Sequence, residues 1–467
     1  MLFSSNIFLL AFLPAVIILN TLIKPKYSNY LLLIASLLFY AWGEPIYVLL
    51  MLFSVLLNWS FGLWIEKAQK GRQLLLTICV LLNLSILGFF KYYNFFAGSF
   101  NSLLGAEIIA LKNIALPIGI SFFTFQALSY VIDLYRGNCK VQKNVLSLAL
   151  YVSFFPQLIA GPIVRYSDID EQITNRTVSL EKFAIGFRRF LYGLGKKIII
   201  SNMMAELADN IFGLPMEELT TATAWIGALA YTMQIYYDFS GYSDMAIGLG
   251  KIFGFDFLEN FNYPYLSSSI HEFWQRWHIS LGTWFREYVY IPLGGNRKGK
   301  LKTYRNLIAV FFLTGMWHGA SWTFILWGLY HGFFQIIERL KLKNFLSKHK
   351  VISKIYCLLV VIFGWVLFRS ETLIGSIRYI LRMLVPWKYG FSNMFNLSVE
   401  LTNKHIFTFI LAFIGCGLLQ SFSNKIPKIS KKWKYSKLET LYLGLLLIYC
   451  LILLTAGTYN PFIYFRF

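Results

Sequence analysis

The sequence predicts an all-α integral membrane protein that crosses the bilayer several times. Of its 467 residues, 57% are hydrophobic and 18% are aromatic. Only 14% are charged, whereas an average soluble domain is about 25% charged. Many of the hydrophobic residues form runs long enough for an α-helix to cross a hydrocarbon core of about 30 Å. These features exclude a disordered, a collagenous and an ordinary cytosolic chain.

The charge pattern indicates cytoplasmic loops and no nucleic-acid partner. The chain carries 43 Lys and Arg against 22 Asp and Glu, a net charge of +21. The basic residues fall between apolar runs and do not form one stripe, as the positive-inside bias of membrane proteins predicts. The five cysteines include no CxxC pair, so we expect neither a disulfide framework nor a zinc site.

The first part of the chain predicts four helices. The opening run, 2–23, precedes its first basic residue, Lys24, whereas a secretory signal peptide carries its positive charge first. We therefore expect a retained helix with its amino end outside the cell. The other three predicted helices span residues 30–42, 46–65 and 74–90. Counting crossings from an outer amino terminus places the cluster Lys67 to Arg72 in the cytoplasm.

The middle of the chain is apolar but irregular. Pro117 and Gly119 interrupt the run 116–131, and Gly161-Pro162 ends the run 146–160. Broken backbone at membrane depth must line a cavity or be buried in protein. We therefore expect re-entrant or tilted helices that other parts of the protein enclose.

Three further segments of the middle region carry charge among apolar residues. The segment 183–202 contains four basic residues and is predicted to be an interfacial helix. The segment 220–253 is predicted to be a helix with Asp238 and Asp244 in apolar surroundings. The segment 267–292 is aromatic but too charged to face lipid.

The last third predicts a hairpin and three more helices. A basic loop at 296–305 and a basic cluster at 339–350 flank about thirty apolar residues. We expect this stretch to form two short helices or a re-entrant hairpin. The later helices are predicted at 351–368, 406–422 and 441–454. Because no repeat or linker divides the chain, we expect one domain over residues 1–467, with an outer aromatic tail at 457–467.

Two of the six histidines are candidates for chemistry. His318 lies in the sequence Trp-His-Gly within an apolar run, and His278 lies in Arg-Trp-His. An ionisable residue at membrane depth is costly and is a functional hypothesis by default. Burial keeps a histidine neutral near pH 7, as a general base requires. The alternative is a histidine that hydrogen-bonds a backbone carbonyl and only supports the fold.

Other catalytic patterns fail on their spacing. His271-Glu272 is followed by a histidine only at position 278, so it is not the HExxH motif of metalloproteases. The chain has no complete P-loop and no GxSxG nucleophile elbow. Asp238 and Asp244 do not share a helical face, so we expect them to hold helix ends or to orient a histidine. A local ion pair with Arg136 is the simplest interpretation of Asp133.

Several motifs together resemble the membrane-bound O-acyltransferase family. They span residues 117–126, 129–137, 155–163, 237–248, 272–280 and 290–297. Within the family, the chain is similar to the bacterial branch of the alginate O-acetyltransferase membrane subunit. Residues 1–5, the stretch 40–45 and Phe368-Arg369 extend this likeness to nearly the whole chain.

The resemblance implies a fold and a set of site residues. The fold is a ring of tilted helices around a thinned centre, where a cytoplasmic donor and an extracytoplasmic acceptor meet at a histidine. His318 matches that histidine, and His278 matches the second family histidine. The family needs no metal. The remaining candidate substrate-binding residues are Gln126, Asp133, Arg165, Asp238, Ser240, Asp244, Trp277, Trp317 and Ser321. Trp317 and Ser321 are also candidates to stabilise an oxyanion.

The resemblance also implies the reaction and its partners. The donor is expected to be acetyl-CoA or another acyl thioester, with no bound cofactor. The acceptor is an exopolysaccharide or a cell-wall polymer, reached through an extracytoplasmic SGNH-type partner. We expect a multi-pass protein of the bacterial inner membrane, surrounded by lipid, with both termini outside. The alternatives are D-alanyl transfer to teichoic acid and, from another class, a small-solute transporter, which would normally show inverted repeats.

The carboxyl-terminal tail gives two readings. Its last residues, 462–467, resemble the Phe-x-Tyr-x-x-Phe tail of a small partner peptide of D-alanylation systems. That likeness implies that Tyr464 accepts the acyl group and hands it to the partner's serine. The alternative is an interfacial aromatic anchor.

Overall fold

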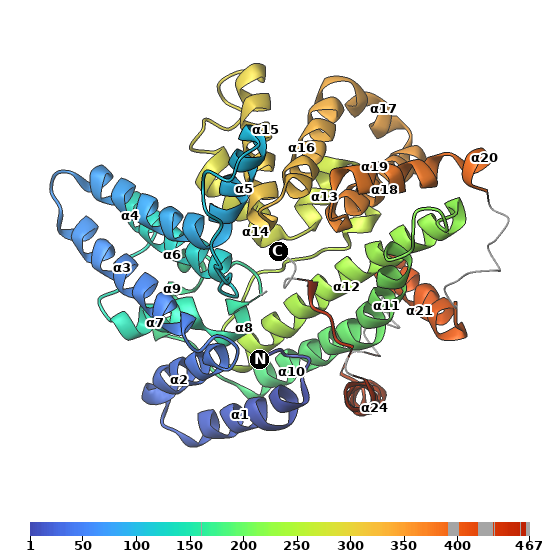
Figure 1. The fold of residues 1–467 in the computed structure, drawn as a ribbon. Coiled ribbons are helices and arrows are strands. Elements are labelled where there is room, and N and C mark those ends of the chain that lie inside the picture. Colours follow the sequence, from blue (N-terminus) through green and yellow to red (C-terminus); the bar gives the residue numbers. More distant parts are fainter. Residues whose placement is uncertain (160, 391–400, 419–432, 434, 458, 464–467) are drawn as a thin grey trace. The chain divides into compact units, whose positions relative to one another are not determined.

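The structure is a computed structural model that describes residues 1–159, 161–390, 401–418, 433, 435–457 and 459–463. All regular elements in this part of the chain are helices, as predicted (Figure 1). The chain forms two compact units. The first contains residues 1–190 and 245–258, and the second contains residues 191–244 and 259–467. Tyr464 lies outside the described residues.

The first unit contains the amino-terminal helices and short π- or 3₁₀-helical turns, labelled η. They are η1 (Phe8–Phe12), α1 (Leu13–Leu22), η2 (Pro25–Tyr27), α2 (Ser28–Ala41), α3 (Tyr47–Lys67), α4 (Arg72–Leu87), η3 (Gly88–Tyr92), α5 (Tyr93–Leu104), α6 (Ile120–Arg136), α7 (Val145–Ser153), α8 (Phe155–Leu158), α9 (Tyr166–Thr174) and the start of α10 (Leu180–Gly195). Helix α6 is buried along most of its length and packs against α3 and α4.

Helices form in all four amino-terminal runs that predicted them, but the fourth is longer than expected. The predicted end at residue 90 precedes Lys91, the first charge after the run. The ammonium group of Lys91 donates a hydrogen bond to Ser121 Oγ, 3.2 Å away. Because this charge has a polar partner inside the protein, the helix continues through η3 into α5 and ends at Leu104. Further on, α6 begins only after Gly119, which adopts a left-handed φ of 77°.

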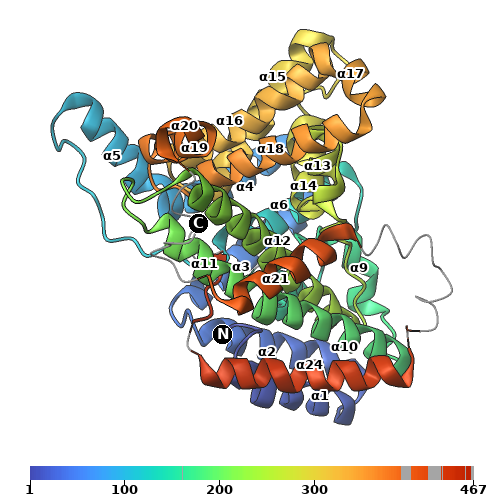
Figure 2. The same ribbon diagram turned by 90° about the vertical axis from the view of Figure 1, so that its right-hand side faces the viewer.

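The second unit contains the remaining helices. They are η4 (Lys196–Ser201), α11 (Asn202–Phe212), most of α12 (Thr221–Ile252), η5 (Pro264–Leu266), α13 (Ile270–Arg276), α14 (Ile279–Phe285), η6 (Arg286–Tyr290), α15 (Lys300–His318), α16 (Trp322–Ile337), η7 (Glu338–Leu342), α17 (Lys343–Lys348), α18 (Lys350–Arg369), α19 (Leu373–Leu384), α20 (Pro386–Tyr389), α21 (Asn403–Phe413), η8 (Ile414–Leu418) and α24 (Lys437–Ala456). Helix α16 packs between α15 and α18, and α11 packs against α21 (Figure 2).

Two expectations for the second unit need correction. The basic stretch 296–305 is not wholly a loop, because α15 begins at Lys300. The segment 183–202 is not simply an interfacial helix, because the Lys197 side chain is buried in the protein. An acidic partner on α12 neutralises this lysine, which removes the need for contact with water or lipid headgroups.

Large aromatic side chains form the core of the second unit. Trp277, Trp327 and Trp365 are almost completely buried. The rings of Trp277 and Trp365 lie 4.7 Å apart, and Phe368 packs 4.8 Å from Trp327. We call Trp277, Trp327, Trp365 and Phe368 the aromatic cluster. Such side chains bury about 150–250 Å² each. The aromatic cluster therefore contributes a large buried apolar area to the core of this unit.

Four helical segments in the described part of the chain are long and apolar enough to cross a bilayer. They are Tyr47–Lys67, Arg72–Leu104, Lys350–Arg369 and Lys437–Ala456. Most of their large apolar side chains outside the packed faces are exposed, for example Leu49, Leu81 and Leu445. Exposed apolar surface of this extent is typical of lipid-facing helices.

Candidate active site

The α15–α16 hairpin places His318 at its turn, as the sequence predicts. His318 is the last residue of α15, and the backbone of Gly319 is extended, which ends the helix. Glycines allow the two helices to approach closely. A Cβ atom at Gly315 would collide with the carbonyl oxygen of Phe324, and one at Gly328 would collide with that of Phe311. The glycines of the sequence Gly-Met-Trp-His-Gly therefore serve the packing of the hairpin.

Aromatic rings enclose His318. Its side chain is buried, and its ring centroid lies 4.9 Å from that of Trp317, 5.0 Å from Trp327 and 5.2 Å from Phe368. All three rings stand nearly perpendicular to the imidazole. An apolar enclosure disfavours the imidazolium form and excludes bulk water. His318 is therefore in an environment suited to a neutral base.

His278 lies at a break between α13 and α14 and has an unusual backbone. Its φ of 44° and ψ of 54° are left-handed. Such a conformation costs free energy in a residue with a side chain, and it is concentrated at functional sites. His278 lies outside the four segments long enough to cross the membrane. Burial lowers the pKa of His278 to about 3, so the imidazole is neutral at pH 7.

Asn260 fixes the orientation of the His278 ring. The Oδ1 atom of Asn260 lies 3.2 Å from Nδ1 of His278 and accepts a hydrogen bond from the Ser280 hydroxyl at 2.9 Å. The amide nitrogen of Asn260 donates to Ser243 Oγ at 2.9 Å. Because a carboxamide oxygen only accepts, Nδ1 carries the proton and Nε2 is left as the basic nitrogen. Asn260 thus has the role that the sequence had assigned to an aspartate.

Trp317 connects the two histidines. Its ring packs nearly perpendicular to His278, with centroids 5.9 Å apart, and also contacts His318. Trp277, which precedes His278 in the chain, belongs to the aromatic cluster. The structure therefore brings together His318, His278, Trp317 and Trp277, four of the candidate residues. Ser321 follows within the turn, where its hydroxyl caps α16 and lies 2.8 Å from Thr323 Oγ1.

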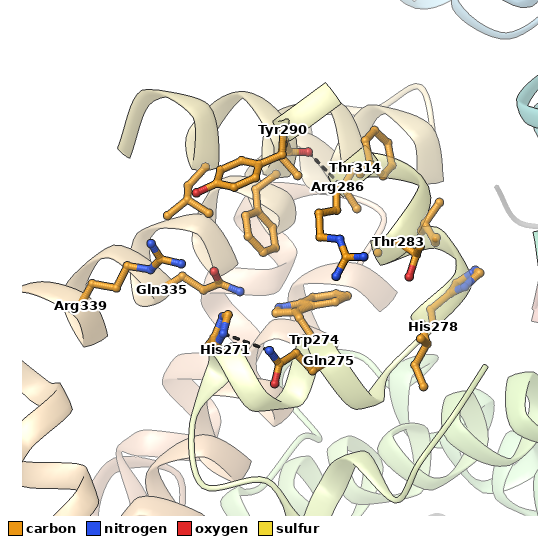
Figure 3. A pocket seen from close by; sticks show the side chains of 17 residues that line it. His271, Trp274, Gln275, His278, Thr283, Arg286, Tyr290, Thr314, Gln335 and Arg339 are labelled. Carbon is orange, nitrogen blue, oxygen red and sulfur yellow. Dashed lines mark hydrogen bonds between the residues drawn. The ribbon is translucent and has the colours of Figure 1, made fainter. Parts of the chain in front are cut away.

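A cavity of about 290 Å³ adjoins His278 (Figure 3). Its walls include apolar side chains of α13, α14 and α15, among them Trp274, Phe285 and Phe311. Two guanidinium groups, those of Arg286 and Arg339, also line it. Figure 3 shows His278 on one side and Arg339 on the opposite side of the cavity. An apolar chamber with a few polar groups is the usual form of a small-molecule site.

The two candidate aspartates of α12 form ion pairs with adjacent lysines. Asp238 Oδ1 lies 2.7 Å from Lys197 Nζ, with both side chains 1% exposed. Asp244 Oδ2 lies 2.6 Å from Lys196 Nζ, with exposures of 17% and 31%. Both aspartates lie well inside α12, so the expectation that they hold helix ends was wrong. Ser240 lies buried on the same helix.

Three other candidates belong to the first unit and make local contacts there. Gln126 is completely buried on α6. Asp133 accepts a hydrogen bond from Ser167 Oγ at 2.9 Å. The guanidinium of Arg165 pairs with Asp168 at 2.6 Å, at the start of α9. These contacts give Asp133 and Arg165 a structural role, whereas the buried side-chain amide of Gln126 has no hydrogen-bond partner among the described residues.

Sequence reasoning missed several residues of the site. Asn260 stands in no recognisable motif, and the arginines of the cavity become neighbours only through the fold. A signal existed for Lys196 and Lys197. Two lysines in one apolar run and two aspartates in another predict pairing, because unpaired charges are seldom buried.

Comparisons with known proteins agree with the motifs. The family model described as MBOAT, membrane-bound O-acyltransferase family, matches residues 67–377. This range includes both histidines, Asn260 and the entire cavity lining. The described part of the chain contains no cluster of three or more His, Cys, Asp or Glu side chains that could hold a metal.

Several known proteins are similar to this chain, over different shares of its length. A probable alginate O-acetylase AlgI of Pseudomonas putida is 42% identical over 491 residues, covering 100% of both chains. A peptidoglycan O-acetyltransferase of Helicobacter pylori is 38% identical and covers 82% of this chain and 80% of its own. A teichoic acid D-alanyltransferase of Bacillus subtilis is 33% identical over 46% of this chain and 56% of its own.

Proposed function

The chain belongs to the membrane-bound O-acyltransferase family, and from this premise we propose that it moves acetyl groups across the bacterial inner membrane. The donor is a cytoplasmic thioester, and the final acceptor is an extracellular or cell-wall polysaccharide. The observation that carries this proposal is the pair of buried histidines on either side of Trp317, beside a cavity with apolar walls. As a family member with apolar helices, the chain is a multi-pass membrane protein.

The extent of similarity favours acetyl over D-alanyl as the transferred group. The relatives that match this chain over 82% or more of its length are named as acetylases or acetyltransferases. The D-alanyltransferase matches less than half of it. The names of these relatives also support a polysaccharide such as alginate or peptidoglycan as the final acceptor.

The chemistry follows from the basic nitrogen of His318. The imidazole takes the proton from an attacking hydroxyl, whose oxygen forms a bond to the thioester carbonyl carbon. Collapse of the resulting oxyanion breaks the carbon–sulfur bond, and the proton passes to the leaving thiolate to give a free thiol. His278, held by Asn260, positions one of the substrates with its Nε2 atom. Trp317 and the Ser321 region are the nearest candidates to stabilise the oxyanion.

The cavity beside His278 suits a donor such as acetyl-CoA. Its apolar walls match an extended, weakly polar pantetheine arm. Arg339 offers a planar donor group of the kind that binds phosphate in a bidentate manner, and Arg286, which pairs with Glu287 at 2.8 Å, lies on the same cavity.

We assign acceptance of the acetyl group on the outer side of the membrane to the carboxyl-terminal tail. Tyr464 would take the acetyl group as a phenyl ester, and the serine of an SGNH-type partner would then attack this ester and regenerate the phenol. A phenyl ester is more activated than an alkyl ester, which makes a tyrosine a suitable relay. Gln126, Asp133, Arg165 and Ser240 remain proposed substrate-binding residues.

A comparison of two donors tests the proposed function. Membranes from cells that express the chain and its SGNH-type partner are incubated with radiolabelled acetyl-CoA or with a radiolabelled D-alanyl carrier protein. We expect alkali-labile label in the polysaccharide from acetyl-CoA alone, because the full-length relatives are acetyl-transferring proteins. Membranes without the chain provide the control. Label from the D-alanyl carrier at an equal or higher level would reverse the assignment of the acyl group.

The orientation in the membrane gives a separate prediction. Single cysteines placed in the basic clusters 67–72, 297–305, 339–350 and 425–437 should all resist an impermeant maleimide added from outside. Most of the last cluster lies outside the described residues. A cysteine at the exposed position Gly457, after the last crossing, should react and serves as the control. Outside labelling of any of the four clusters would contradict the predicted orientation.

A further inference from the structure

The segment that follows the last helix is bound to the second unit along its whole described length. Two side-chain contacts begin it. The Tyr459 hydroxyl donates to Asp209 Oδ2 at 2.7 Å, and Asn460 Oδ1 accepts from Asn202 at 3.2 Å. Phe462 then packs 4.8 Å from Tyr242, and both Phe462 and Ile463 are buried. We call residues 459–463 the docked segment. In Figure 1 it is the dark red coil beside α11 and α12.

The buried ion pair of Lys197 and Asp238 binds the backbone of this segment. Lys197 Nζ donates to the carbonyl oxygen of Pro461 in addition to pairing with Asp238. The second carboxylate oxygen of Asp238 accepts a hydrogen bond from the Ile463 N–H at 2.9 Å. Each partner of the pair therefore holds one backbone group of the docked segment. Because backbone groups are bound, the contact fixes the position of the chain itself.

The free energy that it costs to bury the charges of Lys197 and Asp238 explains why this ion pair needs the docked segment. Transfer of two charged side chains from water into the protein costs a large desolvation free energy for each ion. The attraction between them offsets this cost only if they are well aligned and their other hydrogen-bonding positions have partners. The backbone of Pro461 and Ile463 satisfies one such position on each partner. Apolar pairs of similar volume often stabilise a fold as well as a buried ion pair does, so we explain this pair by what it binds. The neighbouring pair of Lys196 and Asp244, on the same helices, lies closer to the surface.

The docked segment ends in the hydrophobic core that also contains rings around His318. Its contacts move from Asp209 to Asn202 and then to Lys197. Twelve residues along this helical stretch correspond to about 18 Å at 1.5 Å per residue. Ile463 ends in the same hydrophobic core as Trp277, Trp327 and Phe368, which surround the two histidines. The residue that follows Ile463 in the chain is Tyr464.

We propose that Lys197 and Asp238 are positioning residues that clamp the backbone of residues 461–463 and so hold the chain that continues into Tyr464, the proposed acyl relay. The proposal rests on the proposed function, which makes Tyr464 the acyl relay. The clamp is a separate claim, because it concerns the placement of described residues and can be measured without acyl transfer.

Cysteine accessibility measures the clamp directly. In a background with the five native cysteines replaced, Ile463→Cys should react slowly with an impermeant maleimide in spheroplasts, because position 463 is only 2% exposed. The double variant Lys197→Met/Asp238→Asn removes both charges, so no lone charge is left buried to prevent folding. We expect the cysteine at position 463 to react at least about tenfold faster in this double variant than with the ion pair intact, because the docked segment then detaches more often. Gly457→Cys should react equally in both backgrounds.

Two matched changes refine this measurement. Lys196→Met/Asp244→Asn removes the neighbouring pair and should leave the labelling rate of Ile463→Cys unchanged. Ile463→Pro removes the N–H that donates to Asp238 and also fixes φ. It should lower polymer acylation at least about tenfold, because one hydrogen bond to a charged group is worth that much. Ile463→Val keeps the N–H and should acylate at the normal rate.

The outcomes separate the clamp from the relay. Unchanged labelling in the Lys197→Met/Asp238→Asn variant overturns the clamp, whatever happens to acylation. Faster labelling with full acylation by that variant overturns the role of the pair in holding the relay. Faster labelling together with normal acylation by Tyr464→Phe supports the clamp and overturns the relay. Faster labelling with loss of acylation in both variants supports both.

Discussion

Replacement of His318 with Gln is expected to lower acyl transfer by about a thousandfold while the protein still inserts into the membrane. A positioned general base contributes about a hundredfold to ten-thousandfold to the rate, and a thousandfold corresponds to about 4 kcal/mol of transition-state stabilisation. Glutamine fills much of the same space within the cage of Trp317, Trp327 and Phe368 but cannot accept the proton. The measurement is release of free thiol from labelled acetyl-CoA by purified membranes.

A second histidine provides a matched control for this change. His405 is also buried, but it lies at the start of α21, where its ring bonds with the Thr402 hydroxyl at 3.1 Å. His405→Gln places glutamine at the third position of a Thr-capped helix, which is a capping box. This variant should therefore fold and transfer acetyl normally. Normal thiol release by His318→Gln at equal expression would rule out His318 as the base.

The helices were predictable because they are local features of the sequence. Apolar runs of sufficient length mark α3, α18 and α24, and each forms close to its predicted range. The motifs also predicted the family, which the comparisons confirm. The hairpin that holds His318 was one of the two forms expected for the apolar stretch between basic segments. All of these signals lie within about thirty neighbouring residues.

The contacts that shape the site were less predictable because they join distant parts of the chain. The pairing of Lys197 with Asp238 depends on how two helices pack, and each charge alone only suggested an exposed or a functional residue. The role of Asn260 depends on the left-handed turn at His278, which no residue pattern announces. The cavity is likewise formed by side chains of several helices, from His271 to Arg339.

The difference between local sequence signals and distant contacts also applies to the candidate residues that do not lie near the two histidines. Asp133 belongs to a motif that carries the family resemblance and Arg165 follows another such motif, yet in the structure each has a local partner. A motif can be specific to a family because its fold needs those residues. Family membership and a role in substrate binding are therefore separate conclusions, and only the second requires geometry.

Replacement of Tyr464 with Phe is expected to reduce polymer acylation to the level of membranes that lack the chain. The change removes only the hydroxyl that would carry the acetyl group, and it keeps the aromatic ring that an interfacial anchor would need. The clamp on residues 461–463 should be unaffected, because it binds backbone groups of those residues. The assay is alkali-labile acetyl in the polymer, alongside mass spectrometry of the carboxyl-terminal peptide.

The two readings of the tail give different results in this assay. If Tyr464 is a relay, the chain without the substitution carries a transient acetyl ester on the peptide that contains Tyr464. This ester accumulates when the SGNH-type partner is absent, because no partner serine then removes the acetyl group. Tyr449→Phe provides a matched control, since this tyrosine is 50% exposed on α24 and is expected to face lipid. Full acylation by Tyr464→Phe would leave the tail as an anchor. The acetyl group would then have to pass from the His318 site straight to the partner, and the buried ion pair would serve only to hold the end of the chain in place.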